Sequence, residues 1–156
     1  MALNTQIDLR SLAQGARRAA ASLAAASTAR KDDALRRMAR LLGERQGELI
    51  EANAKDLNFG REKGLSAAML DRLALDEARL RGMQRAREEV AALAAPVGEV
   101  DGLRARPSGI QVGRMRIPLG VVLMIYEARP NVTADAAALC LKSGNAAILR
   151  GGSEAF

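Results

Sequence analysis

The sequence contains no histidine and no tryptophan, and it has one cysteine, one tyrosine and two phenylalanines. Without histidine, the chain alone cannot build a histidine-based metal site or a Ser-His or Cys-His catalytic pair. The single cysteine, Cys140, excludes an intrachain disulfide and is typical of a reducing compartment. Few aromatic side chains are available on which nucleic-acid bases could stack. We therefore expect no metal site and no nucleic-acid partner.

Long apolar runs are also absent. No uninterrupted run approaches the ~18 residues of a membrane span, so no membrane partner is expected. The start of the chain is rich in alanine and arginine, as transit peptides are, but Asp8 and the Asp32–Asp33 pair argue against one. A secretory hydrophobic region is missing as well. The expected location is the cytoplasm.

The composition is that of a globular chain, with 49% hydrophobic and 27% charged residues in a length of 156. The net charge of +6 lies mainly in residues 1–40, which hold eight basic and three acidic residues. Residues 1–95 are predicted to be helical, because apolar residues recur every three or four positions over 5–26 and 28–54. Ser66 and Asp76 are expected to cap two further helices, of which Pro96 ends the second.

The pattern changes after Pro96. Residues 97–118 are predicted to form a β-ribbon, in which Gly113 marks a shift in the alternation of apolar residues and therefore a β-bulge or a tight turn. Arginines at 104, 106, 114 and 116 make one side of this ribbon basic. We expect its exposed edge to pair with another segment or with another subunit.

Residues 119–156 are predicted to form a βαβ unit of an α/β fold. A buried strand over 121–125, a helix over 133–143 and a second strand over 146–149 are joined by short connections. Ligands of open parallel sheets gather at the carboxyl ends of the strands, which here are the segments 126–131 and 150–153. These two loops are the candidate site.

The segment 116–156 contains the motifs PLGV, IYEARPNVT, LKSGN and ILRGGS, in that order. By these motifs and their spacing it resembles the γ-glutamyl phosphate reductases, a branch of the aldehyde dehydrogenase superfamily. Upstream, ANAKDL, LDRL and RGMQRAREEVAALAAPVGEV also fit the family's pattern, so the resemblance covers nearly the whole chain.

This resemblance implies an NADPH-dependent reduction of L-glutamate 5-phosphate to L-glutamate 5-semialdehyde and phosphate, in proline biosynthesis. It also implies that residues 1–156 are the N-terminal part of a cofactor-binding domain, and that the catalytic domain with its nucleophilic cysteine is absent. Cys140 is interpreted as a buried structural thiol. We expect this chain to be inactive alone, and its expected macromolecular partners are a C-terminal fragment or further copies of itself in a homo-oligomer.

Asn131 occupies the place from which the superfamily supplies an oxyanion donor, so the resemblance implies a catalytic role for it. From the residues alone, Asn131 could equally cap the following helix or form an Asx turn. Arg129 could meet an anionic phosphate or carboxylate of the substrate, or could form a salt bridge with Glu127 or another local acid.

The resemblance implies that the cofactor is held by Tyr126 and by the loop Arg150, Gly151, Gly152 and Ser153. Arg150 could form an ion pair with a 2′-phosphate, and Ser153 could donate a hydrogen bond to it. Because NADPH carries this phosphate and NADH does not, the loop favours NADPH. An ordinary strand-to-helix turn with a surface arginine is the alternative for this loop. For the whole chain, the alternative function is a non-catalytic module that binds a dinucleotide or pairs with a second subunit through residues 106–117.

Overall fold

The computed structural model describes residues 8–127 and 129–152, so that Ser153 of the predicted cofactor loop lies outside the described residues. In these ranges the chain forms six helices and two two-stranded sheets. The helices are α1 (Leu9–Ala25), α2 (Thr28–Glu44), α3 (Gln46–Glu62), α4 (Ala67–Leu73), α5 (Glu77–Ala92) and α6 (Pro130–Lys142). The strands are β1 (Val100–Ala105), β2 (Gln111–Met115), β3 (Val121–Ile125) and β4 (Ala146–Arg150).

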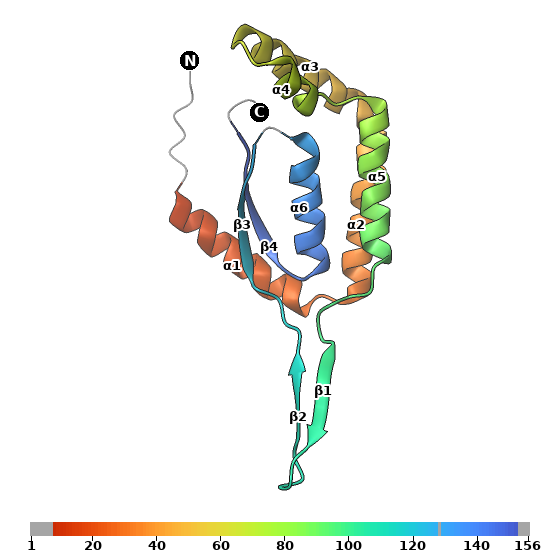
Figure 1. The fold of residues 1–156 in the computed structure, drawn as a ribbon, viewed down its shortest axis with the longest axis vertical. Coiled ribbons are helices and arrows are strands. Elements are labelled where there is room, and N and C mark those ends of the chain that lie inside the picture. The colour runs from red at the N-terminus through yellow and green to blue at the C-terminus, as the bar shows by residue number, and fades with distance from the viewer. Residues whose placement is uncertain (1–7, 128, 153–156) are drawn as a thin grey trace.

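The body of the molecule is layered (Figure 1). The β3–β4 pair lies between α1 and α6, α2 and α5 pack on the outer side of α6, and α3 and α4 lie across one end. Ala146 and Ile148 of β4 pack against Ala16, Ala20 and Leu23 of α1. Small side chains at these contacts let the backbones approach closely, as the alanine-rich composition requires. No helix in the described part of the chain is long and apolar enough to cross a membrane.

Four of the helices have an N-cap side chain that accepts a hydrogen bond from a backbone amide of the first turn, and two of these caps, Ser66 and Asp76, were predicted from the sequence. Ser66 accepts a hydrogen bond from the amide of Met69, and Asp76 accepts one from the amide of Arg79. Asp8 and Ser27 do the same for α1 and α2. These oxygens satisfy amide groups that have no partner within their own helix.

The single helix predicted over residues 28–54 is wrong, because the structure divides it into α2 and α3 at Arg45. Arg45 has φ −104° and ψ 20°, and it ends one helix and begins the next. Gly43 and Gly47 flank the break, and each weakens a helix relative to alanine. The apolar positions continue across the break, which is why the periodicity did not reveal it.

The β1–β2 hairpin projects from the body (Figure 1), and every residue of its two strands is exposed. Asp101 pairs with Arg114 and Arg104 with Val112, so two residues of β1 lie opposite Gly113. The irregularity is therefore in β1 and not at Gly113, where the sequence predicted it. Gly102 has φ +63°, a conformation that glycine adopts at little cost, and it supplies the extra residue.

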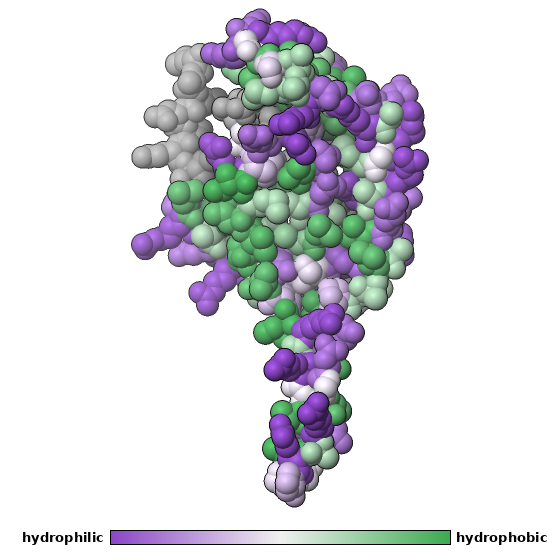
Figure 2. Space-filling model, viewed as in Figure 1, coloured by the Kyte–Doolittle hydropathy of each residue, from purple (hydrophilic) through white to green (hydrophobic). Residues whose placement is uncertain are grey.

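The βαβ unit forms as predicted. β3 pairs with β4 in parallel, with Val121 opposite Ala146 and Ile125 opposite Arg150. The expectation that residues 121–125 are buried on both faces is wrong for this structure, since Leu123 is 61% and Ile125 is 69% exposed. Within the described residues β3 has only β4 as a neighbour, and Figure 2 shows hydrophobic surface over this region.

Candidate functional site

The carboxyl ends of β3 and β4 meet at Tyr126. Its amide donates to the carbonyl oxygen of Arg150 at 3.1 Å, which extends the parallel ladder by one residue. Its hydroxyl lies 2.6 Å from Oγ1 of Thr133 in the first turns of α6. A Cβ placed on Gly151 would lie 3.7 Å from the Tyr126 ring, so the glycine backbone lies directly beside this ring. The two predicted loops therefore converge on one tyrosine.

The described part of the predicted cofactor loop is open to solvent at Arg150 and half-buried at Gly151 and Gly152. Within the described residues, the Arg150 side chain forms no ion pair. An exposed guanidinium is suited to binding an anionic group. The two glycines beside it leave the backbone accessible, so that such a group could approach closely.

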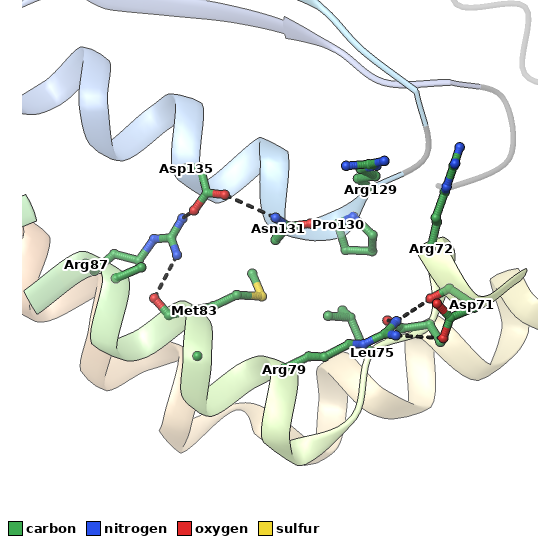
Figure 3. Close-up of a pocket in the computed structure, with 13 residues that line it drawn as sticks. Asp71, Arg72, Leu75, Arg79, Met83, Arg87, Arg129, Pro130, Asn131 and Asp135 are labelled. Carbon is green, nitrogen blue, oxygen red and sulfur yellow. Dashed lines mark hydrogen bonds and ion pairs between the residues drawn. The ribbon is translucent and has the colours of Figure 1, made fainter. Parts of the chain in front are cut away.

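A second recess lies between α4, α5 and the N-terminus of α6 (Figure 3), with a volume of about 490 Å³. Its charged lining comprises Asp71, Arg72, Arg79, Arg87, Arg129 and Asp135. These groups give the recess an excess of positive charge. The amino end of α6 adds to it, because the first amides of a helix point outward and carry partial positive charge.

Two of the four arginines in this recess form ion pairs with an acid and hydrogen bonds to a backbone carbonyl. Arg79 forms an ion pair with Asp71 at 2.7 Å and donates to the carbonyl of Ala74 at 2.8 Å. Arg87 forms an ion pair with Asp135 and donates to the carbonyl of Met83 at 2.7 Å. These two arginines serve to join elements of the fold.

The other two arginines are less constrained. Arg72 approaches Glu127 only to 4.0 Å, and both side chains are largely exposed. The side chain of Arg129 has no ion pair within residues 8–127 and 129–152, so the predicted alternative pairing with Glu127 is not formed there. Arg129 has φ −130° and ψ 103°, the extended conformation that the following proline favours. Arg72 and Arg129 are thus available to bind an anion.

Asn131 lies at the edge of this recess as the second residue of α6. The N-cap is Arg129, without a side-chain capping bond, and Pro130 begins the helix. Instead of capping, the Asn131 side-chain nitrogen donates to Oδ2 of Asp135 at 3.2 Å. The predicted capping alternative is therefore wrong. The exposed amide remains able to donate a second hydrogen bond.

Cys140 lies in the interior, on α6. Burial raises the pKa of its thiol, so that the thiolate is scarce at neutral pH. A nucleophile needs the opposite arrangement, with exposure and a lowered pKa. The environment agrees with the interpretation of Cys140 as a structural residue.

The structure adds four residues that were not singled out as site residues from the sequence, namely Arg72, Arg87, Thr133 and Asp135. Asp135 could have been found, because it follows Asn131 by four positions and so lies on the same face of α6. Arg72 and Arg87 approach α6 only through the packing of α4 and α5, which leaves no signal in the local sequence.

The fold defines the chain as an α/β protein with a parallel strand pair, a class in which ligands commonly bind at the carboxyl edge of the sheet. No family model matches the chain. It is 56% identical over 154 residues to the γ-glutamyl phosphate reductase of Moorella thermoacetica, covering 99% of this chain and 37% of the relative. It is 54% identical to the enzyme of the same name from Colwellia psychrerythraea, over 97% of this chain and 36% of the relative.

Solved structures agree with these relatives. The crystal structure of γ-glutamyl phosphate reductase from Thermotoga maritima matches with a TM-score of 0.91 and 42% identity, over 94% of this chain and 35% of that one. The Saccharomyces cerevisiae structure matches with a TM-score of 0.89 and 37% identity, over 92% of this chain and 37% of that one. The chain is thus homologous, over nearly its whole length, to the N-terminal part of the γ-glutamyl phosphate reductases, which confirms the resemblance and the fold class. It spans about a third of the length of these relatives.

Proposed function

We propose that this chain forms the cofactor-binding part of an enzyme that reduces L-glutamate 5-phosphate to L-glutamate 5-semialdehyde and phosphate, in proline biosynthesis in the cytoplasm. The observation that carries the proposal is the 56% identity to a γ-glutamyl phosphate reductase over 154 residues. The convergence of both strand ends on Tyr126 supports it, because this edge is where an α/β sheet receives its ligand.

The proposed cofactor is NADPH, which supplies the hydride. Tyr126, Gly151 and Gly152 would lie against it, and Arg150 would pair with the 2′-phosphate while Ser153 donates to it. The test is Ser153→Glu in a complete enzyme, since a carboxylate at this position repels a 2′-phosphate. We expect the ratio of NADPH to NADH affinity to fall by about tenfold or more. An unaltered ratio would refute this assignment.

The proposed substrate site is the recess beside α6. Arg129, which forms no ion pair within the described residues, would bind a phosphate or carboxylate oxygen, and Arg72 would join it by giving up its long 4.0 Å contact with Glu127. The N-terminus of α6 favours the same negative charge. Asn131 would donate to the carbonyl oxygen, on which negative charge develops during acyl transfer and again during hydride transfer. We place the nucleophilic thiolate outside this chain, because Cys140 is buried with a raised pKa.

The experiment is complementation. The purified chain is assayed alone, and then together with a separately expressed C-terminal remainder of the Moorella thermoacetica relative, by following NADP⁺ reduction with semialdehyde and phosphate. We expect activity only in the mixture. Asn131→Ala in the active mixture should lower turnover by about 10²-fold. A mixture that stays inactive while the two parts bind each other would favour a non-catalytic module.

A second function, pairing with another subunit, is favoured by the β1–β2 hairpin. The hairpin exposes large apolar residues, among them Ile110, Met115 and Ile117, and its Arg104, Arg106 and Arg114 line one side. Exposed apolar residues on a projecting ribbon are typical of an interaction surface. Sedimentation of the chain and of an Ile110→Asp, Met115→Asp variant tests this function, with a dimer expected only for the former.

A further inference from the structure

We propose that Asp135 is a positioning residue that fixes the side-chain amide of Asn131, and that Arg87 holds Asp135 in place and neutralises it. This inference rests on the proposed role of Asn131 as a hydrogen-bond donor. Asp135 and Arg87 thereby receive roles in positioning the amide, although neither residue was singled out by the sequence motifs or by the comparisons.

The first contact decides how the Asn131 amide points. Asp135 lies one turn after Asn131 on α6, and its Oδ2 accepts a hydrogen bond from Nδ2 of Asn131 at 3.2 Å (Figure 3). An ionised carboxylate only accepts hydrogen bonds, so the amide must turn its NH₂ group and not its oxygen toward Asp135. One N–H is then used by Asp135, and the other N–H of the same nitrogen is left for a ligand oxygen.

The second contact immobilises Asp135. Its other oxygen, Oδ1, forms an ion pair with Nη2 of Arg87, whose side chain is only 1% exposed. Nη1 of Arg87 is committed to the carbonyl oxygen of Met83, and its Nε is buried without a partner. Asp135 is therefore the one acid that the described residues offer to this buried cation, and its loss would leave the charge uncompensated.

The two contacts together also keep the negative charge of Asp135 from opposing the proposed role of Asn131. A carboxylate next to an oxyanion donor would repel the negative charge that the donor is meant to stabilise. Because Arg87 lies against Asp135, the pair is close to neutral, and the carboxylate can orient the amide without opposing the reaction. The arrangement combines rigidity with charge balance, as preorganised donors require.

A purely structural role is the competing explanation, since the Arg87–Asp135 pair also joins α5 to α6. The two explanations differ in one readout. If the pair only joins helices, Asp135 substitutions alter stability and act on turnover independently of Asn131. If Asp135 positions Asn131, its effect on turnover disappears once Asn131 is absent.

The test is a double-mutant cycle in a complete enzyme, made by replacing the matching N-terminal part of the Moorella thermoacetica relative with this chain. Asp135→Asn should lower kcat about tenfold with KM within about twofold. In an Asn131→Ala background the same substitution should change kcat by less than about twofold. The variant Arg87→Met with Asp135→Asn removes the buried cation as well, and should regain the melting temperature while kcat stays low.

The outcomes separate the two proposals. If Asn131→Ala leaves kcat unchanged, the assigned role of Asn131 fails, and the positioning proposal fails with it. If Asn131→Ala lowers kcat but Asp135→Asn has its full effect in both backgrounds, or none in either, only the positioning proposal is overturned.

A measurement on the chain itself does not depend on activity. In ¹H–¹⁵N spectra, Asp135→Asn should shift the side-chain amide signals of Asn131, while those of Asn53, which bonds elsewhere, stay in place. Unshifted Asn131 signals would overturn the proposal.

Discussion

Lys142 and Asp32 are 110 residues apart in the sequence, yet Nζ of Lys142 lies 2.6 Å from Oδ1 of Asp32. The same ammonium group donates to the carbonyl oxygen of Ala91 at 2.8 Å. The side chains of Lys142 and Asp32 are 5% and 15% exposed. The carboxyl end of α6 is thereby fixed to α2 and α5, and this helix carries Asn131 and Asp135 at its other end.

The first prediction concerns this buried pair. Asp32→Asn leaves the Lys142 ammonium desolvated without a counter-charge, so the free energy of unfolding should fall by about 3–5 kcal/mol. The matched control is Glu51→Gln, which breaks the exposed Lys55–Glu51 pair and should cost less than about 0.5 kcal/mol. Urea unfolding measures both, and equal effects would contradict the assigned difference in burial.

The second prediction concerns Asn53, a buried residue of α3. Its Nδ2 donates to the carbonyl of Leu73 at 2.8 Å, and its Oδ1 accepts from the amide of Leu75 at 2.7 Å. These bonds hold the segment between α4 and α5 that borders the arginine-lined recess. Asn53→Ala leaves two backbone groups without a partner and should destabilise the chain by about 2–4 kcal/mol.

The control for Asn53 is Asn58→Ala. Asn58 is exposed and bonds to Arg61 of its own helix, so the free energy of unfolding should change by less than about 0.5 kcal/mol. Thermal unfolding of both variants measures the difference. If the free energy of unfolding falls no further for Asn53→Ala than for Asn58→Ala, the bridging role of Asn53 is contradicted.

The parts of this fold that the sequence predicts are those with local signals. Ser66 and Asp76 cap their helices, as their residue types and positions predict. The break at Arg45 was missed because apolar spacing continues through it. The burial of Arg87 was missed because α6, which covers it, lies more than 40 residues further along the chain.

The candidate site divides in the same way. Tyr126, Asn131 and Gly151 follow from strand ends and family motifs, and in the structure a Cβ added to Gly151 would lie 3.7 Å from the Tyr126 ring. The bond between Asn131 and Asp135 replaces the cap that residue type suggested, because Pro130 and an extended Arg129 already begin the helix. The family resemblance indicated Asn131, and the spacing of four residues on α6 could have indicated its partner Asp135. The ion pair that holds Asp135 could not be predicted in this way, because Arg87 reaches it only through the packing of α5 against α6.

The third prediction concerns Gly144, which follows α6 with φ +72°. A Cβ there would meet Cγ of Pro118 at 3.1 Å, and the backbone conformation itself is costly for any other residue. Gly144→Ala should therefore destabilise the chain by about 2 kcal/mol. Gly82→Ala is the control, because Gly82 lies within α5 with open space around it, and alanine there should stabilise by about 0.5–1 kcal/mol. Changes of the same sign in denaturant unfolding would contradict this prediction.

The last prediction uses the pKa of Cys140, which burial raises above the ordinary value of 9.0. The folded state therefore retains the thiol proton at a pH where the unfolded state has lost it. The stability that this residue contributes is fully present below the unfolded pKa, and it is lost as the pH rises past 9.0 toward the folded pKa. Cys140→Ala should consequently lose less stability than the parent chain between neutral and alkaline pH.

Thiol reagents provide the complementary measurement, because native Cys140 should react at least about tenfold more slowly at neutral pH than it does in denaturant. Rapid modification of the native chain, or parallel alkaline stability profiles for the two proteins, would show that the thiol is neither buried nor perturbed.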